Sequence, residues 1–432
     1  MQFAHGLLGL AFFCFVSWLM SSNRNRVPWR IVLIGLSMQV GFGYLVLDTG
    51  IGVSVFETAA EVVTKLISMT EPGAEMVFGV LAKPGVMAEK LGGENSFIFA
   101  FAGSGLIAII FFSALMSVLY HLGVMQFLVW CLAKVMSWLL GVSGAESMAM
   151  AANVFVGQTE APLVVKPYIA LMTKSELNAM MTGGFATIAG SVLAVYVGFI
   201  GEEYGPHLLT ASVMSAPAAF VIAKIMLPET EVPATSGAVP LKFDRNASNL
   251  IEAAANGTTD GLKLWLNVIA MLVAFIALVN LMNWPLGYMG SAWFGMPVGG
   301  ELGALDLNLI FGWVFAPVAW IMGVDGWHDC QVFGSLLGTK VAINEFVAYD
   351  QLIKMLPGGA AEGVGFIHTR SAQMAAYALC GFANFASIGI QLGGITPLAP
   401  ERKKDIAGLA LRAMIGGAFA SWMTASVAGI FL

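Results

Sequence analysis

The sequence predicts an all-α integral membrane protein with eight transmembrane helices and two re-entrant helical hairpins, arranged as an inverted repeat. Of its 432 residues, 58% are hydrophobic and 11% are charged, whereas a soluble domain carries roughly a quarter charged residues. Eight apolar stretches approach or exceed the roughly 20 residues that cross a bilayer as a helix. Two further apolar segments carry polar residues, Gly or Pro at their centres, and one short motif occurs twice. The mean hydropathy of +0.82 agrees with a chain that lies mostly in lipid.

The eight apolar stretches are the first elements that we expect. We predict spans over residues 3–20, 31–47, 97–119, 177–200, 208–226, 262–282, 372–392 and 406–430. No basic n-region, as in a signal peptide, precedes the first apolar stretch. We therefore expect a retained helix and not a cleaved signal peptide.

Basic residues predict the orientation of these spans. Three arginines follow the first span and three basic residues precede the last, and basic loops stay on the cytoplasmic side. These residues are Arg24, Arg26, Arg30, Arg402, Lys403 and Lys404. An even number of spans then places both termini on the periplasmic side of the inner (plasma) membrane. The polar stretch 227–261 is expected to be a cytoplasmic connector.

Four shorter apolar segments do not fit simple spans. Residues 126–140 look amphipathic and residues 309–322 look broken at Pro317, so both are expected along the membrane interface. Residues 145–169 and 332–349 contain polar groups, Gly or Pro in their middles, which favours re-entrant hairpins.

An internal repeat connects the two hairpins with the helices that follow them. Residues 184–191 read GFATIAGS and residues 381–387 read GFANFAS, and each follows a TKS or TRS tripeptide. Each copy is preceded by a hairpin segment with one carboxylate, Glu160 or Glu345. The span count gives the two copies opposite directions through the membrane, which is typical of secondary transporters.

The two hairpin carboxylates are the strongest candidates for a binding site. A carboxylate at bilayer depth costs about 2.5–3.5 kcal/mol on insertion scales, so it is expected to face a cavity, a partner or a substrate. Beside Glu160, Gln158 and Thr159 supply both donors and acceptors. Lys340 is a possible counter-ion for Glu345. Alternatively, each Glu only closes a hairpin tip as a cap or ion-pair partner, but the duplication favours a functional role.

Other polar residues of the repeat allow two interpretations. Asn153, Thr187, Asn384 and Ser387 could serve a site, or they could join membrane helices by hydrogen bonds. Phe382 is a candidate only because Asn384 follows it, since most of the 29 Phe residues are expected to serve packing.

Several functional classes find little support. The net charge of −6 argues against nucleic-acid binding. The four Cys residues are far apart without a CxxC spacing, and the five His residues are dispersed without an HExxH motif. The segment GSLLGTK at 334–340 lacks the Gly-Lys pair of a phosphate loop. We therefore expect no enzyme and no bound transition metal.

Four motifs occur in order along the chain: GQTEAPL at 157–163, FATIAGSV at 185–192, GTKVAINEFVAY at 338–349 and CGFANFASI at 380–388. Together they resemble the concentrative nucleoside transporters in their shorter, bacterial form. The resemblance implies a homotrimer whose protomers have a scaffold and a mobile transport domain. It implies scaffold helices 1–3 in residues 1–120, the first transport repeat in 121–226, the connector and scaffold helix 6 in 227–305, and the second transport repeat in 306–432.

The resemblance also implies which residues bind substrate and ion. It assigns Gln158, Thr159 and Glu160 of the first hairpin, with Val192 of the fourth helix, to the nucleobase. The substrate residues of the second half are Glu345, Phe382, Asn384 and Ser387, of which the carboxylate, amide and hydroxyl suit ribose. It places Na⁺ among the side chains of Asn153 and Thr187 and the carbonyl groups of Val156 and Ile188, because oxygen ligands suit a hard cation.

The expected function is therefore import of nucleosides such as uridine, coupled to Na⁺ and carried out by alternating access. Coupling to H⁺ is the main alternative, and a passive channel for polar solutes is a further one.

Overall fold

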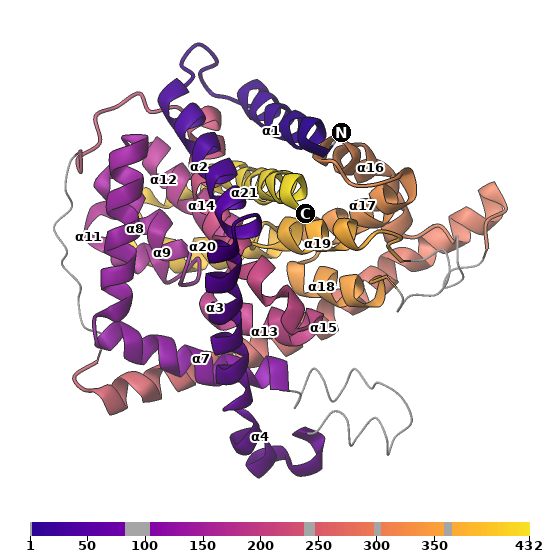
Figure 1. Cartoon of the computed structure of the whole chain (residues 1–432), viewed down its shortest axis with the longest axis horizontal. Coiled ribbons are helices and arrows are strands. Elements are labelled where there is room, and N and C mark those ends of the chain that lie inside the picture. The colour runs from indigo at the N-terminus through magenta and orange to yellow at the C-terminus, as the bar shows by residue number, and fades with distance from the viewer. Residues whose placement is uncertain (1, 83–103, 237–246, 298–303, 358–364) are drawn as a thin grey trace.

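The computed structural model describes residues 2–82, 104–236, 247–297, 304–357 and 365–432, and within these ranges the chain forms helices and no strands (Figure 1). The N-terminal helices are α1 (Gln2–Leu19), α2 (Trp29–Leu47), α3 (Gly50–Ser68), α4 (Glu71–Phe78), η1 (Gly79–Ala82) and α7 (Ser104–His121). The predicted span 97–119 corresponds to α7, and its residues 97–103 lie outside the described residues.

The first repeat follows α7 without a long linker. Its helices are α8 (Val124–Leu140), α9 (Gly144–Asn153), α10 (Ala161–Val164), α11 (Lys166–Ile169), α12 (Lys174–Ala186), α13 (Gly190–Ile200), η2 (Glu202–Tyr204) and α14 (Gly205–Met226). The long helix α15 (Leu250–Phe294) then leads to the second repeat.

The second repeat has the same order of elements. Its helices are α16 (Leu307–Met322), α17 (Trp327–Ala342), α18 (Glu345–Lys354), α19 (Thr369–Leu379), α20 (Phe385–Ile395), η3 (Thr396–Leu398), η4 (Pro400–Arg402) and α21 (Lys403–Phe431). Helices α8, α9, α12, α13 and α14 thus correspond to α16, α17, α19, α20 and α21.

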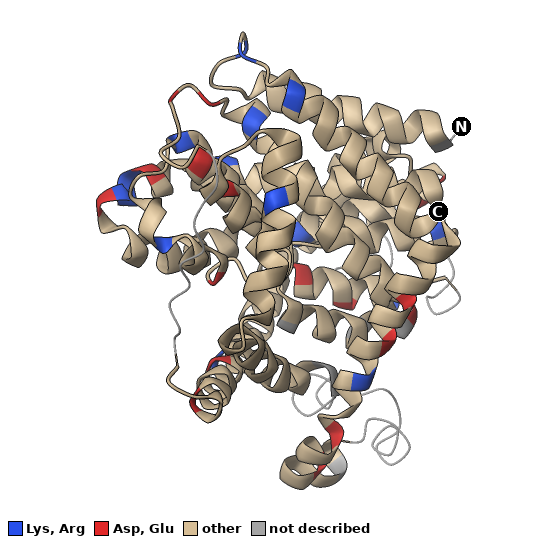
Figure 2. Cartoon of the chain, turned by 60° about the vertical axis from the view of Figure 1, so that its left-hand side comes forward, with Lys and Arg blue, Asp and Glu red and all other residues tan. Residues whose placement is uncertain are grey.

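The helical membrane character is confirmed, whereas the count of eight spans stays a prediction. Four described helices are long and apolar enough to cross a bilayer, and six segments qualify if each bent pair counts as one span. The bent pairs are α7 with α8, at 76°, and α16 with α17, at 113°. Figure 2 shows large uncharged stretches of ribbon, with charged residues mainly near the ends of helices.

Four local predictions are wrong. Residues 177–200 and 372–392 are broken helices, not straight spans. Helix α16 continues through Pro317, because a proline removes one hydrogen bond without necessarily ending a helix. The last residues of the predicted connector belong to α15, which begins at Leu250. Helix α3 was missed because Glu57, Glu61 and Lys65 lower its hydropathy.

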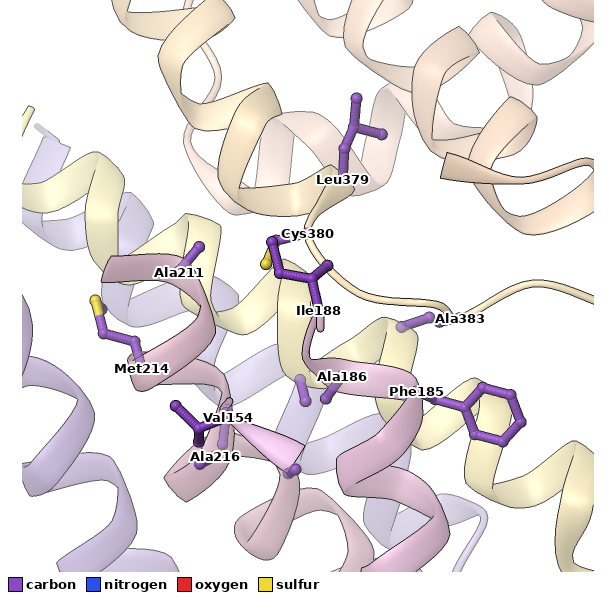
Figure 3. Close-up of a cluster of buried hydrophobic side chains, with 14 of the residues drawn as sticks. Val154, Phe185, Ala186, Ile188, Ala211, Met214, Ala216, Leu379, Cys380 and Ala383 are labelled. Carbon is purple, nitrogen blue, oxygen red and sulfur yellow. The ribbon is translucent and has the colours of Figure 1, made fainter. Parts of the chain in front are cut away.

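The two broken helices cross at their breaks. After α12, Thr187 takes an extended conformation, and after α19, Gly381 has φ +103°. A Cβ at Gly381 would lie 2.6 Å from the Phe185 carbonyl oxygen. Figure 3 shows Ala186 and Ile188 near Cys380 and Ala383. The crossing therefore requires a residue without a side chain at position 381.

Helices α1 and α21 pack antiparallel, so the two ends of the chain meet (Figure 1). Gly6 lies against Ile430 near the C-terminus, and further along both helices the ring of Phe13 lies 5.5 Å from that of Phe419. Both termini therefore lie at the same end of the molecule.

A buried ion network joins the helix ends of the first repeat. The Lys224 ammonium group lies 2.6 Å from Glu146 and 3.6 Å from Glu229. Glu146 and Glu176 complete capping boxes at the starts of α9 and α12, and the Ser143 hydroxyl of the first box donates to Glu176 of the second. These bonds fix α9, α12 and α14 relative to one another.

Candidate functional site

Glu345 lies buried at the first residue of α18, just after the tip of the second hairpin. Asn344 caps this helix by accepting a hydrogen bond from the Val347 amide at 2.9 Å. The Glu345 carboxylate accepts a hydrogen bond on each oxygen: from the Tyr196 hydroxyl at 3.0 Å and from the Asn384 side-chain amide at 2.8 Å. Donors from α13 and from the start of α20 therefore converge on one carboxylate.

Lys340 makes no direct ion pair with Glu345, which corrects the predicted pairing. Its ammonium group donates to the carbonyl groups of Ala378 and Cys380, at 2.8 and 2.9 Å, and to the Ser421 hydroxyl at 2.9 Å. The lysine thus satisfies carbonyls at the broken end of α19, where the helix dipole favours a cation. Its charge acts on Glu345 only over a longer distance.

Asn384 and Ser387 lie at the start of α20. The Asn384 side-chain oxygen accepts from the Ser387 backbone amide at 2.8 Å and caps the helix, which leaves its NH₂ group free to bond Glu345. Within the described residues the Ser387 hydroxyl bonds no protein group, so it can serve a ligand. Phe382 is partly buried in the link before Asn384.

The far end of α20 meets the tip of the first hairpin. A Cβ at Gly394 would lie 2.7 Å from Thr159 Cγ2. A Cβ at Gly184 would lie 2.7 Å from Gln391 Nε2 and 3.0 Å from Gln158 Cβ, so both glutamines pack on α12. The buried side-chain oxygens of Gln158 and Gln391 have no hydrogen-bond partner. They are unsatisfied acceptors beside the hairpin tip.

Helix α20 thus connects the two hairpins. Asn384 contacts the second hairpin, and Gln391, seven residues later, lies beside the first. A helix rises about 1.5 Å per residue, which separates these two positions by roughly 10 Å. One nucleoside, with its base at one end and its sugar at the other, is of this scale.

Glu160 makes no hydrogen bond to Glu345 or Asn384. It is exposed, and it accepts a hydrogen bond from the Gly157 amide at 3.3 Å. It lines a cavity of about 500 Å³ between the first hairpin, α7 and α15, together with Tyr120, Asp260 and Lys263. Its assignment to the nucleobase stays a prediction. Val192, which is buried on α13, lies one turn before Tyr196.

The four residues predicted to bind Na⁺ come together where the first hairpin meets the break between α12 and α13. The Thr187 hydroxyl donates to the Asn153 carbonyl at 2.8 Å, and the Gly190 amide donates to the Phe155 carbonyl at 2.9 Å. Val156 and Ile188 lie outside helices in these two turns, so their carbonyl groups are not committed to a helical ladder.

The residues at this junction fit a hard cation. The Asn153 side-chain amide donates to the Met180 carbonyl at 3.3 Å, while its buried oxygen has no hydrogen-bond partner. An unsatisfied amide oxygen, together with the hydroxyl and carbonyl oxygens of the same junction, suits Na⁺, because oxygen ligands suit a hard cation. Among the described residues there is no cluster of His, Cys, Asp or Glu that could hold a transition metal.

Two residues of the site were missed from sequence. Tyr196 lies one turn after Val192, and its ring lies 4.5 Å from that of Tyr349. Gln391 lies two turns after Asn384 on the same side of α20. Helical spacing from the repeat motif could have found both, since residues four and seven apart share a helix face.

Comparisons with known proteins match this chain to a family. Three family profiles cover most of the chain: "Na+ dependent nucleoside transporter N-terminus" at residues 8–81, "Nucleoside recognition" at 106–203 and "Na+ dependent nucleoside transporter C-terminus" at 207–429. The chain belongs to the concentrative nucleoside transporter family. The profile descriptions make Na⁺ the coupling ion of this family, which consists of transporters and not of enzymes.

Relatives of the family occur in bacteria and mammals. Solute carrier family 28 member 3 of Mus musculus is 42% identical over 98% of this chain, and sodium/nucleoside cotransporter 1 of Rattus norvegicus is 41% identical over 98%. The chain spans 58% and 63% of the length of these two proteins. The uncharacterized transporter YutK of Bacillus subtilis (strain 168) is 42% identical, with 99% of each chain covered.

Solved structures of the family share the whole fold. The structure of CNTnw in an inward-facing substrate-bound state has a TM-score of 0.89 at 41% identity, covering 100% of this chain and 98% of that one. A doubly substituted variant of CNTnw in an outward-facing state has a TM-score of 0.90 at 40% identity with the same coverage.

Proposed function

We propose that this protein is a Na⁺-coupled symporter that imports nucleosides by alternating access. The observation that carries the proposal is that one helix, α20, reaches both hairpin tips: Asn384 at its start bonds Glu345, and Gly394 near its end lies against Thr159. Between them, Gln391 and Gln158 both lie against Gly184. A ligand lying along this helix meets a carboxylate at one end and amide groups at the other.

The chemistry of the two ends supports a nucleoside as the ligand. A carboxylate accepts hydrogen bonds from hydroxyl groups, which suits the sugar at Glu345, Asn384 and Ser387. An amide presents both a donor and an acceptor, so the unpaired oxygen of Gln158 can accept from a nucleobase edge. Phe382 and Val192 supply apolar surface for the base, with Thr159 and Glu160 completing the first-hairpin side.

The coupling ion binds at the Asn153 junction in this proposal. The side chains of Asn153 and Thr187 and the carbonyl groups of Val156 and Ile188 hold Na⁺, which fixes the hairpin tip against α12 and α13. Since Gln158 follows this junction by a few residues, the bound ion also positions the base side of the site.

The proposal extends to the assembly and its placement in the membrane. Residues 121–226 and 306–432 form the two repeats of a mobile transport domain, and residues 1–120 and 227–305 form a scaffold that joins three copies into a homotrimer. The chain lies in the inner membrane with both termini on the periplasmic side. Helices α1 and α21 pack antiparallel, which brings both termini to one end of the molecule. This packing supports a placement of both termini on the same side of the membrane.

Binding calorimetry on purified protein tests the coupling. If Na⁺ and nucleoside stabilise one state, linkage requires each to raise the affinity of the other, by about tenfold or more for a typical coupling energy. Uridine is titrated in Na⁺ and in choline at the same pH and ionic strength. Equal uridine affinities would contradict Na⁺ coupling, and an affinity that changes with pH alone would identify H⁺ as the coupling ion.

A further inference from the structure

The fully buried side chain of Tyr196 is hydrogen-bonded to the Glu345 carboxylate. Its hydroxyl donates to one carboxylate oxygen at 3.0 Å, and Asn384 donates to the other at 2.8 Å. Tyr196 and Asn384 come from different repeats, α13 of the first and the start of α20 in the second. Donors from both repeats therefore fix the position of the carboxylate.

The ring of Tyr196 is fixed by aromatic neighbours on α18, the helix that carries Glu345. Its centroid lies 5.1 Å from that of Phe346 in an edge-to-face arrangement and 4.5 Å from that of Tyr349. Tyr196 and Tyr349 are both fully buried, and the Tyr349 hydroxyl donates to the Ala376 carbonyl at 2.9 Å. Only one of the two buried tyrosines thus donates to Glu345.

The two side-chain donors leave acceptor capacity on Glu345. An ionised carboxylate has about four lone-pair sites, two on each oxygen. Tyr196 takes one site on the first oxygen and Asn384 takes one on the second. The carboxylate can therefore still accept from hydroxyl groups of a ligand, such as those on the 2′ and 3′ carbons of ribose.

We propose that Tyr196 is a positioning residue that orients Glu345 to accept both hydroxyl groups of a ribose, and thereby sets the preference for ribonucleosides over nucleosides without these hydroxyls. The proposal rests on the proposed function, because it assumes that Glu345 meets the sugar. Without the Tyr196 hydroxyl, one carboxylate oxygen loses its side-chain donor, and the carboxylate is held less firmly in this orientation.

The test compares uridine with 2′,3′-dideoxyuridine, which keeps the base and lacks both hydroxyls. Tyr196→Phe keeps the aromatic packing and removes one donor. Its affinity for uridine is expected to fall about tenfold, the scale of one hydrogen bond to a charged group, with the affinity for 2′,3′-dideoxyuridine unchanged. The ratio of the uridine affinity to the 2′,3′-dideoxyuridine affinity therefore falls. A merely structural role would weaken both ligands equally and leave the ratio at its wild-type value, which would overturn the proposal.

Tyr349→Phe is the matched control, because it removes a hydroxyl from the same buried cluster without touching Glu345. Its affinity ratio is expected to equal that of the wild type. A ratio that falls as far in Tyr349→Phe as in Tyr196→Phe would show that the cluster acts only through packing, and would also overturn the proposal.

Further variants keep the test decisive. Replacing Tyr196 by 4-aminophenylalanine retains the ring and a weaker donor, so the ratio should lie between those of Tyr and Phe. If Tyr196→Phe does not give monodisperse protein, 4-methylphenylalanine at position 196 replaces it, because its methyl group fills the space of the hydroxyl and cannot donate. A wild-type ratio in this variant overturns the proposal, and a reduced ratio supports it. In Glu345→Gln, adding Tyr196→Phe should not change the ratio further.

The outcomes separate this inference from the proposed function. If the wild-type protein binds neither nucleoside, or if Glu345→Gln binds uridine as tightly as the wild type, the proposed site fails. If Glu345→Gln loses uridine affinity while Tyr196→Phe keeps the wild-type ratio, only the role of Tyr196 fails.

Discussion

Three side chains near the first hairpin tip each leave a buried oxygen unpaired. By contrast, Thr424 and Ser426 of α21 bond carbonyl groups within their own helix. The oxygens of Asn153, Gln158 and Gln391 are buried without a partner. Leaving a buried polar group unsatisfied costs about 1–3 kcal/mol, and a ligand bound as we propose would satisfy several such oxygens at one place.

The proposed cation site gives a prediction for Asn153. Asn153→Ala removes the unpaired amide oxygen from the proposed cation site, so the Na⁺ concentration that half-saturates uridine binding should rise about tenfold or more, as for the loss of one ligand or hydrogen bond to a charge. A Na⁺ titration followed by uridine calorimetry measures this.

Asn178→Ala is the matched control for this experiment. Asn178 is also buried, its amide donates to the Ala223 carbonyl at 3.2 Å, and its oxygen is also without a partner, but it lies on the α14 side of α12. The control should keep the Na⁺ dependence of the wild type. An equal shift in both variants would mean that general destabilisation explains the effect of Asn153.

Among single residues, those within the repeated motifs could be predicted from sequence and their partners could not. Asn384 and Glu345 stand in recognisable motifs, and they are hydrogen-bonded. Tyr196 is 149 positions from Glu345 along the chain, and Lys340 bonds carbonyl groups of α19 about 40 positions away. Pairings at such separations depend on how the helices cross, which no local pattern specifies.

At the scale of elements, the breaks in α12–α13 and α19–α20 build the site. Each break exposes backbone groups and starts a new helix, and Asn384 is the cap that starts α20. Where these two breaks cross, the two segments of the backbone approach so closely that only a glycine fits at position 381.

Gly381→Ala is therefore expected to destabilise the fold. The residue has φ +103°, which a side chain rarely adopts, and the added Cβ would lie 2.6 Å from the Phe185 carbonyl oxygen. The combined strain and overlap should lower the free energy of unfolding by about 2 kcal/mol or more. A lowered thermal midpoint in detergent checks this.

Gly389→Ala serves as the control on α20, because a Cβ at Gly389 would meet no atom within 4 Å. It should keep the wild-type midpoint, or raise it slightly, since Ala favours a helix. If Gly381→Ala were as stable as Gly389→Ala, the close crossing of the two breaks would be contradicted.

The existence of most elements follows from hydropathy and periodicity, and their interruptions do not. The stretches 177–200 and 372–392 are largely apolar, so they predict straight spans, although both contain a break. Pro317 predicts an interruption where α16 has none. An interruption is stabilised by tertiary partners, as Lys340 stabilises the end of α19, and these partners lie outside any sequence window.

At the scale of the whole molecule, the candidate site lies between the two repeats, and a cavity lies on the side of the first hairpin. The cavity of about 500 Å³ separates this hairpin from α7 and α15, and Glu160 faces it. Relatives of this fold have been solved in both inward-facing and outward-facing states, with TM-scores to this chain of 0.89 and 0.90. In the alternating access that we propose, the repeats move against α7 and α15, and we expect this cavity to close as the opposite side opens.

Uptake of labelled uridine into proteoliposomes tests whether the Na⁺ gradient drives accumulation of nucleosides, as we propose. With Na⁺ outside and choline inside at equal pH, internal uridine should rise above the external concentration and fall back when an ionophore collapses the Na⁺ gradient. Uridine that only equilibrates to the external concentration, with or without the gradient, would contradict the account and indicate a passive channel.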